Sequence, residues 1–262
     1  MLVSLSFLVA LLGLAIGSFL NVVIYRLPRN ESLVSPASQC PSCGAPIRAR
    51  HNVPLVGWLV LRGRCADCQA PISMRYPLVE FTTAALFVAL TLRLSHLGLL
   101  SALPAYLYFA AIGIALALID LDVQRLPNAI VLPSYPVVAA LLTVAAGVHG
   151  SWSPLLRAVI GGAVLFAFYF ALAFAYPAGM GFGDVKLAGI LGGVLAYLSW
   201  RVLLVGAFGG FLLGALAGLV VLATGRGGRK TALPFGPFMI TGALIAIFAG
   251  SSIADTYNRL GH

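Results

Sequence analysis

The sequence predicts an all-α polytopic membrane protein with about eight transmembrane helices and a small polar insert between the first two. Hydrophobic residues make up 61% of the 262 residues and charged residues only 9%. A soluble domain carries about a quarter charged residues, so most of this surface is expected to face lipid. The mean hydropathy is +1.02. The apolar residues form long runs, unlike the alternating segments of roughly ten residues that build a transmembrane barrel.

The apolar runs predict where the helices cross the membrane. A transmembrane helix needs about 20 mostly apolar residues, and fewer where protein or the interface covers its ends. The sixth candidate is short, and the second contains an acid, Glu80. Eight segments qualify: 2–24, 78–94, 99–119, 129–148, 155–176, 185–199, 202–224 and 233–251.

The charges around the first segment indicate its orientation. No basic region precedes the apolar run, and Arg26 and Arg29 follow it. This pattern favours a retained helix with an external N-terminus over a cleaved signal peptide. With eight spans, twelve basic residues then fall inside and four outside. This positive-inside bias accounts for most of the net charge of +9, so we expect no nucleic-acid partner.

The predicted organisation is a first transmembrane helix (1–25), a cytoplasmic insert (26–77) and a seven-helix membrane domain (78–262). The insert holds all four cysteines, as two C-x-x-C pairs with 21 residues between them: Cys40, Cys43, Cys65 and Cys68. Such pairs converge on one tetrahedral zinc ion. The alternatives are two disulfides or a redox pair, and structural disulfides are rare in the cytosol. Four thiolates would close the site, so this zinc is expected to be structural.

The seven acidic residues separate into solvated and membrane groups. Glu31, Asp67 and Asp255 lie in polar loops. Glu80 is either an interfacial anchor beside Arg75 or a supporting residue of the site. The remaining acids, which lie at the ends of two apolar runs, are Asp120, Asp122 and Asp184. Intramembrane acids are expensive and usually functional. The topology places both runs' ends on the cytoplasmic side, so carboxylates 64 residues apart are expected to face each other.

Two such carboxylates predict acid–base chemistry. Close together in low dielectric, one stays protonated while the other is charged. The charged one takes a proton from an attacking water, and the protonated one donates to an amide carbonyl. Gly181 and Gly183 are expected to allow unusual backbone angles and close approach, and Lys186 to hold the pair's charge or to reach the interface. The alternatives are that Asp184 caps a helix, that Asp122 is solvated beside Arg125, or that the acids form an ion or proton path.

Ordered motifs along almost the whole chain carry a resemblance. They are "GSFLNVVIYRLP", the four cysteines, "LRGRCADCQAPISMRYPLVE", "IDLDVQRLPN", "GFGDVKL" and "LPFGPF". This set resembles the bacterial type IV prepilin peptidases, which are leader peptidases and N-methyltransferases of the G-x-G-D aspartyl protease family. The sequence departs from them slightly, with "LPN" where many members have "LPD".

The resemblance implies an inner-membrane aspartic endopeptidase that cuts the leader from prepilins and pseudopilins on the cytoplasmic side. It implies Asp120 and Asp184 as catalytic residues, zinc on the four cysteines, and N-methylation with S-adenosylmethionine as methyl donor. The peptidase context is the type IV pilus or type II secretion. The rival interpretation is a transporter or proton pathway, which acids clustered away from the midplane disfavour. Cofactor-binding residues and the oligomeric state are not indicated by the sequence.

Overall fold

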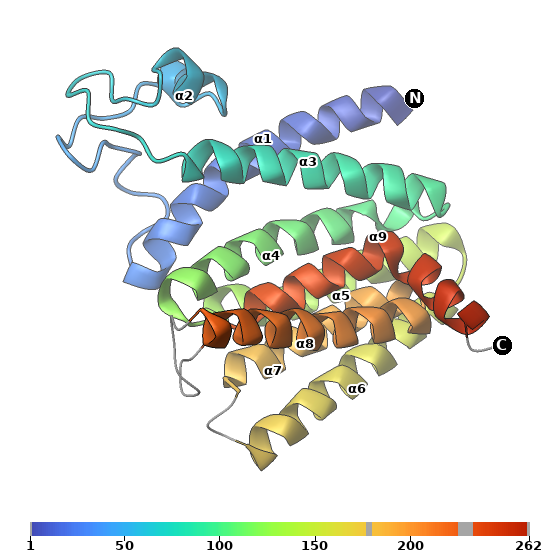
Figure 1. Cartoon of the computed structure of the whole chain (residues 1–262). Coiled ribbons are helices and arrows are strands. Elements are labelled where there is room, and N and C mark those ends of the chain that lie inside the picture. The colour runs from blue at the N-terminus through green and yellow to red at the C-terminus, as the bar shows by residue number, and fades with distance from the viewer. Residues whose placement is uncertain (1, 177–179, 225–232, 261–262) are drawn as a thin grey trace. The chain divides into compact units, whose positions relative to one another are not determined.

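The computed structural model describes residues 2–176, 180–224 and 233–260, with the side chains of 251–260 left aside, and this part is almost entirely helical (Figure 1). Each predicted apolar segment contains a helix. Their bounds are α1 Leu2–Arg26, α3 Arg75–His96, α4 Leu103–Val123, α5 Asn128–His149, α6 Ser153–Ala175, α7 Phe182–Leu198, α8 Trp200–Ala223 and α9 Gly236–Leu260. The insert carries a short α2 (Val56–Val60), and three 3₁₀ turns are Leu27–Arg29, Ala49–His51 and Leu100–Ala102.

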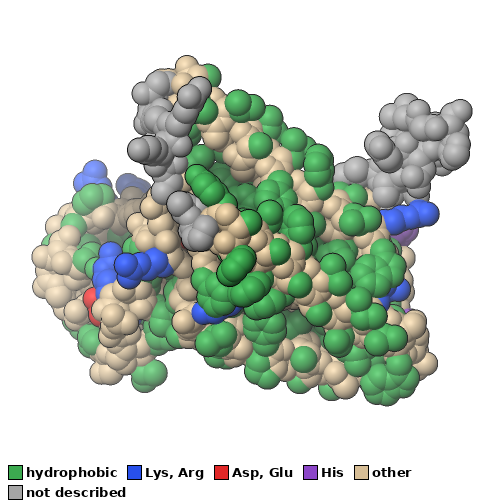
Figure 2. Space-filling view, turned by 90° about the horizontal axis from the view of Figure 1, so that it is seen from below, with side chains coloured by type: hydrophobic (Ala, Val, Ile, Leu, Met, Phe, Trp, Pro, Cys, Tyr) green, Lys and Arg blue, Asp and Glu red, His purple; other side chains and the backbone are tan. Residues whose placement is uncertain are grey.

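Helix lengths confirm the predicted membrane class. Within the described residues, six helices are long and apolar enough to cross a bilayer. The shorter ones are α7, with 17 residues, and the apolar part of α9, Gly236–Gly250. The predicted short sixth segment is therefore short in the structure as well. Hydrophobic side chains spread over the face seen in Figure 2, with basic side chains in a few groups.

The chain divides into two compact units. The first comprises residues 1–103 and 110–115, and the second residues 104–109 and 116–262, so that α4 contributes to both. In the first unit, α1 packs along α3. The side-chain amide of Asn21 donates to the carbonyl oxygen of Tyr76 at 3.2 Å, which ties the end of α1 to the start of α3.

The second unit is built around α7. Helix α6 packs on α7, and α8 packs on α9. Twelve of the 17 residues of α7 are buried, whereas only 11% of the most apolar stretch of α8 is buried. A helix that is apolar all round and enclosed by protein is a core element, so α7 forms the centre of this unit. Two glycines of α8 allow a close approach of the segment that contains α9, since Gly210 lies against Met239 and Gly214 against Phe235.

Candidate functional site

Two buried acids come together in the second unit. Asp120 is in the last turn of α4 and Asp184 in the first turn of α7, and their side chains are only 5% and 8% exposed. The two carboxylates interact electrostatically. Two like charges that interact in a buried site cannot both ionise easily, so the pair titrates as one unit. The structure therefore brings together the two acids that the sequence singled out across 64 residues.

The start of α7 sets the direction of Asp184. The N-cap residue is Gly181, and the backbone N–H of Asp184 donates to the Gly181 carbonyl oxygen at 3.0 Å. The alternative that Asp184 is itself the N-cap is wrong, because Asp184 lies three residues further into the helix. Its carboxylate turns back towards Gly181, as an acid at the third helical position does in a capping box.

The two glycines of G-x-G-D have different tasks. Gly181 has φ −73° and ψ 144°, an extended conformation that any residue adopts, so the expected need for unusual backbone angles is not found there. Gly183 is required for space, because a Cβ at this position would lie 3.0 Å from the Cβ of Leu126. Pro177 and Gly179, which precede this motif, lie outside the described residues.

Asp120 is held by the start of α9. The backbone N–H of Gly236 donates to Asp120 Oδ2 at 3.0 Å, in a buried contact between residues 116 positions apart. Leu126, in the connection from α4 to α5, approaches both Gly183 and Gly236. One side chain therefore lies against the backbone next to each acid. The sequence motifs "IDLDVQRLPN", "GFGD" and "LPFG" meet at this point.

A cluster of three aromatic rings lies next to Asp184. Tyr169 of α6 is fully buried and interacts electrostatically with Asp184. Its ring centroid is 5.3 Å from that of Phe211 and 6.4 Å from that of Phe235, and Phe211 and Phe235 are 5.4 Å apart. This cluster joins α6, α8 and the residue that precedes Gly236.

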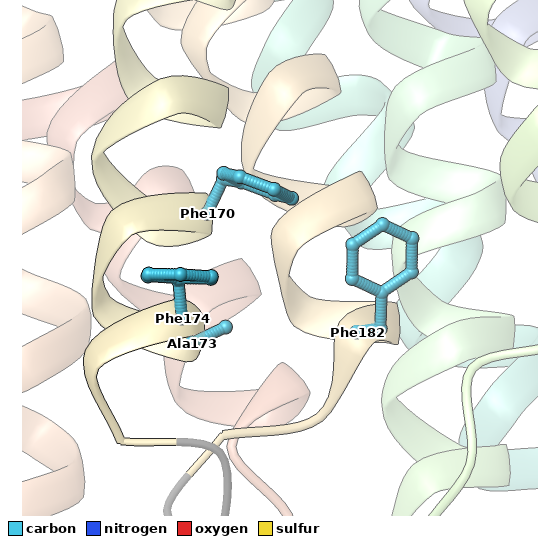
Figure 3. A pocket seen from close by; sticks show the side chains of 4 residues that line it. All are labelled: Phe170, Ala173, Phe174 and Phe182. Atoms are coloured by element: carbon cyan, nitrogen blue, oxygen red, sulfur yellow. The ribbon is translucent and has the colours of Figure 1, made fainter.

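Lys186 interacts with α5 and with an aromatic ring. Its ammonium donates to Asn128 Oδ1 at 2.9 Å and lies 4.9 Å from the centroid of the Phe182 ring. Asn128 is the first residue of α5, so Lys186 ties α5 to α7. Phe182 also borders an open apolar hollow of about 270 Å³, whose other side is formed by α6 residues (Figure 3). The lining residues are Phe170, Ala173, Phe174 and Phe182.

The other two acids near the ends of apolar helices, Asp122 and Glu80, have different surroundings from the Asp120–Asp184 pair. Asp122 is exposed, although it lies only two residues from Asp120. Glu80 is buried, and its Oε2 accepts the backbone N–H of Leu55 at 2.7 Å. Glu80 therefore anchors the loop of the insert to α3, which refines the expectation of an interfacial anchor beside Arg75.

The four cysteines form a candidate metal centre in the insert. All four lie in the described part without a disulfide, and their Sγ atoms lie within 4.8 Å of one another. The Sγ atoms of Cys40 and Cys68 are 3.8 Å apart. Tetrahedral zinc with Zn–S bonds of about 2.3 Å places its sulfur atoms about 3.8 Å apart, so the cluster fits this ion.

Both C-x-x-C pairs have the same local fold. The N–H of Cys40 donates to the Ala45 carbonyl oxygen, and the N–H of Cys65 donates to that of Ala70, at 2.9 and 2.8 Å. The backbone N–H groups of Cys43 and Ser42 lower the pKa of the Cys40 thiol from 9.0 to about 6. The loop thus favours the thiolate that a metal ligand must be at Cys40. For Cys43, the Ala45 N–H lowers the pKa of the thiol, but the neighbouring thiol of Cys68 helps to raise it to about 12.

Sequence reasoning missed the supporting residues around Asp120. Gly236, Leu126, Tyr169 and Phe235 were not among the candidates. The only signal for Gly236 and Phe235 was the motif "LPFGPF", which was recognised but given no role. For Leu126 and Tyr169 the sequence offered no sign beyond an apolar or aromatic residue near a membrane acid.

Comparison with known proteins identifies the family of this chain. The bacterial peptidase A24 N-terminal domain matches residues 11–94, and the type IV leader peptidase family matches residues 106–254. A prepilin leader peptidase/N-methyltransferase of Pseudomonas putida is 37% identical over 97% of this chain and 94% of its own length. The same-named protein of Aeromonas hydrophila is also 37% identical, over 95% and 92%. That of Pseudomonas aeruginosa is 35% identical, over 94% and 91%. No solved structure gives a significant match. The chain therefore belongs to the type IV leader peptidase family.

Proposed function

We propose that this chain is a membrane aspartic endopeptidase that cleaves the leader peptide of type IV prepilins and pseudopilins and N-methylates the new N-terminal residue. The observation that carries this proposal is the pair of buried, interacting carboxylates of Asp120 and Asp184. The names and coverage of the relatives support the same activity. They favour it over the alternative of a transporter or proton pathway.

The acid pair supplies both proton transfers of peptide hydrolysis. One carboxylate takes a proton from water as the water oxygen bonds to the scissile carbonyl carbon. The other, protonated carboxyl donates its proton to the carbonyl oxygen. The carbon–nitrogen bond then breaks, and the carboxyl that took the water's proton gives it to the leaving amine. The other carboxylate takes a hydroxyl proton back from the intermediate as the product carboxyl group forms, which restores the starting pair. No covalent intermediate with the enzyme is required.

Two further groups belong to the proposed function. The four thiolates of Cys40, Cys43, Cys65 and Cys68 hold a structural zinc that gives the small insert a stable fold. The methyl group comes from S-adenosylmethionine and bonds to the freed amino nitrogen, with the donor's sulfur as leaving group. The positive-inside bias supports a location in the bacterial inner membrane with a periplasmic N-terminus, a cytoplasmic insert (26–77) and an active site that faces the cytoplasm.

The test compares purified wild type with Asp120→Asn and Asp184→Asn on a prepilin substrate in detergent or liposomes. Each substitution removes one proton-transfer group, and we expect cleavage to fall about 10²–10⁴-fold. Asp122→Asn is the matched control, because this exposed acid lies in the same helix. Mass spectrometry of the product reports cleavage and methylation together. Full cleavage by either of the first two variants would exclude the assigned pair.

A further inference from the structure

The residues at the start of α9 contact the Asp120 carboxylate directly. This stretch is the "LPFG" half of the motif "LPFGPF", residues 233–236. Gly236 is buried, and its N–H makes a hydrogen bond of 3.0 Å to Asp120 Oδ2. This bond occupies one oxygen of the carboxylate and leaves the other for water or substrate.

A side chain at this position would press on the Asp120 carboxylate. A Cβ on residue 236 would lie 2.9 Å from Asp120 Oδ2 and 3.3 Å from Leu126 Cδ2. The first distance is below any normal contact, so a larger residue must push the carboxylate away from the N–H. Because Asp120 is only 5% exposed, it has little room to move without leaving its place opposite Asp184.

The rest of the stretch fixes the direction of this N–H. The ring of Phe235 packs in the aromatic cluster with Tyr169 and Phe211. Its edge also fills the space left by Gly214 of α8, where a Cβ would lie 2.9 Å from Phe235 Cε2. The residue next to Gly236 is therefore held on two sides, by α6 and by α8.

We propose that Gly236 is a positioning residue of the peptidase site, and that its N–H holds the Asp120 carboxylate in its reactive orientation. Phe235 supports it by anchoring the stretch in the aromatic cluster. This inference rests on the proposed role of Asp120. A hydrogen bond to a charged acceptor is among the stronger ones in proteins, and a small displacement of a catalytic group lowers the rate steeply.

Gly236→Ala tests this role by steady-state cleavage of a prepilin, with rates expressed per folded molecule. We expect kcat to fall about ten- to a hundredfold with KM unchanged, since the substrate still binds and only the acid is misplaced. The pH profile of kcat should also change, and its acidic limb should move to higher pH, because the charged carboxylate loses its donor.

Two control substitutions at other glycines separate the loss of kcat in Gly236→Ala from a general weakening of α8–α9 packing. Gly242→Ala places a Cβ 2.5 Å from the Gly210 nitrogen, so it disturbs α8–α9 packing away from the acids. Gly209→Ala meets only ordinary contacts, at 3.5 Å or more. We expect Gly242→Ala to lower the melting temperature without changing kcat per folded molecule or the pH profile, and Gly209→Ala to change neither.

The outcomes decide between the proposals. If wild type does not cleave prepilin, the proposed function fails. If wild type cleaves and Gly236→Ala matches Gly242→Ala in kcat and pH profile, only the role of Gly236 fails. Should Gly236→Ala not fold, Phe235→Leu replaces it as the test. A several-fold lower kcat at unchanged KM in that variant supports the inference, and an unchanged kcat overturns it.

Discussion

Glu80 links the cysteine-bearing insert to the membrane helices of the first unit, and its removal should loosen the insert measurably. Its Oε2 accepts the Leu55 N–H at 2.7 Å, and Glu80 is 8% exposed. Leu55 has φ +60°, a conformation that costs a residue with a side chain about 1–3 kcal/mol. The carboxylate therefore holds a strained loop that would otherwise relax.

The expected size follows from this contact. A hydrogen bond to a charged group contributes about 1.5–3 kcal/mol, and the loop strain is released when the bond is lost. Glu80→Ala should therefore raise the population of the open loop at least about tenfold, since 1.4 kcal/mol corresponds to a factor of ten. Glu80→Gln keeps an acceptor of similar shape and should give a smaller change.

Limited trypsin digestion measures this opening. Cleavage at Arg62 and Arg64 is followed by mass spectrometry, at low protease so that the rate follows the open population. Glu31→Ala is the control, because Glu31 is an exposed acid at the other end of the same insert. Equal cleavage rates in Glu80→Ala and Glu31→Ala would show that the hydrogen bond between Leu55 and Glu80 does not hold the loop closed.

Two more predictions concern the metal centre and α7. Cys40→Ser or Cys65→Ser should lower bound zinc at pH 7, because each substitution removes one of the four thiolate ligands. Bound zinc should also decrease as the pH is lowered, because protons compete with the metal for the thiolates. A mutant that keeps one zinc per chain would contradict the four-thiolate site. Gly189→Ala would place a Cβ 2.2 Å from the Tyr135 hydroxyl oxygen, so it should lower the melting temperature. Tyr135→Phe in the same chain should recover part of that loss, and a further decrease would contradict this contact.

Hydrophobic run length predicted the helices well, because lipid imposes the same requirement on every span. The sixth segment shows this clearly: its 17 residues are few for a span, and the structure buries them in protein instead. The cysteine spacing was equally informative, since two C-x-x-C turns have few ways to converge. Topology paired Asp184 with the acids that end the third apolar run, because acids at like ends of such runs share a membrane depth, and the family resemblance selected Asp120 over Asp122.

Contacts between distant side chains could not be predicted in the same way. The Gly236 bond to Asp120 joins residues 116 positions apart, and no periodicity encodes it. For Gly181, the sequence predicted a feature that the structure does not have. A glycine before an acid suggested special backbone angles, but the structure needs glycine at position 183, where Leu126 approaches. The sequence shows that a glycine is present, whereas only the neighbouring atoms in the structure show whether it provides space or an unusual backbone angle.

The position of Asp184 depends on donors from three other helices. The Tyr135 hydroxyl of α5 donates to the Lys186 carbonyl oxygen at 2.6 Å, and the Tyr106 hydroxyl of α4 donates to that of Val194 at 2.7 Å. At the far end of α7, the Arg157 guanidinium of α6 donates to the Tyr197 and Leu198 carbonyl oxygens at 2.6 and 3.0 Å.

These contacts restrain α7 both along its axis and about it. Carbonyl groups at the C-terminal end of a helix have no partner within the helix, and a cation there also interacts favourably with the helix dipole. Arg157 therefore prevents α7 from sliding, while the two tyrosines prevent it from rotating. Since a carboxylate pair works only when both acids keep their separation, a short helix fixed by protein suits Asp184 better than a long span free to tilt in lipid.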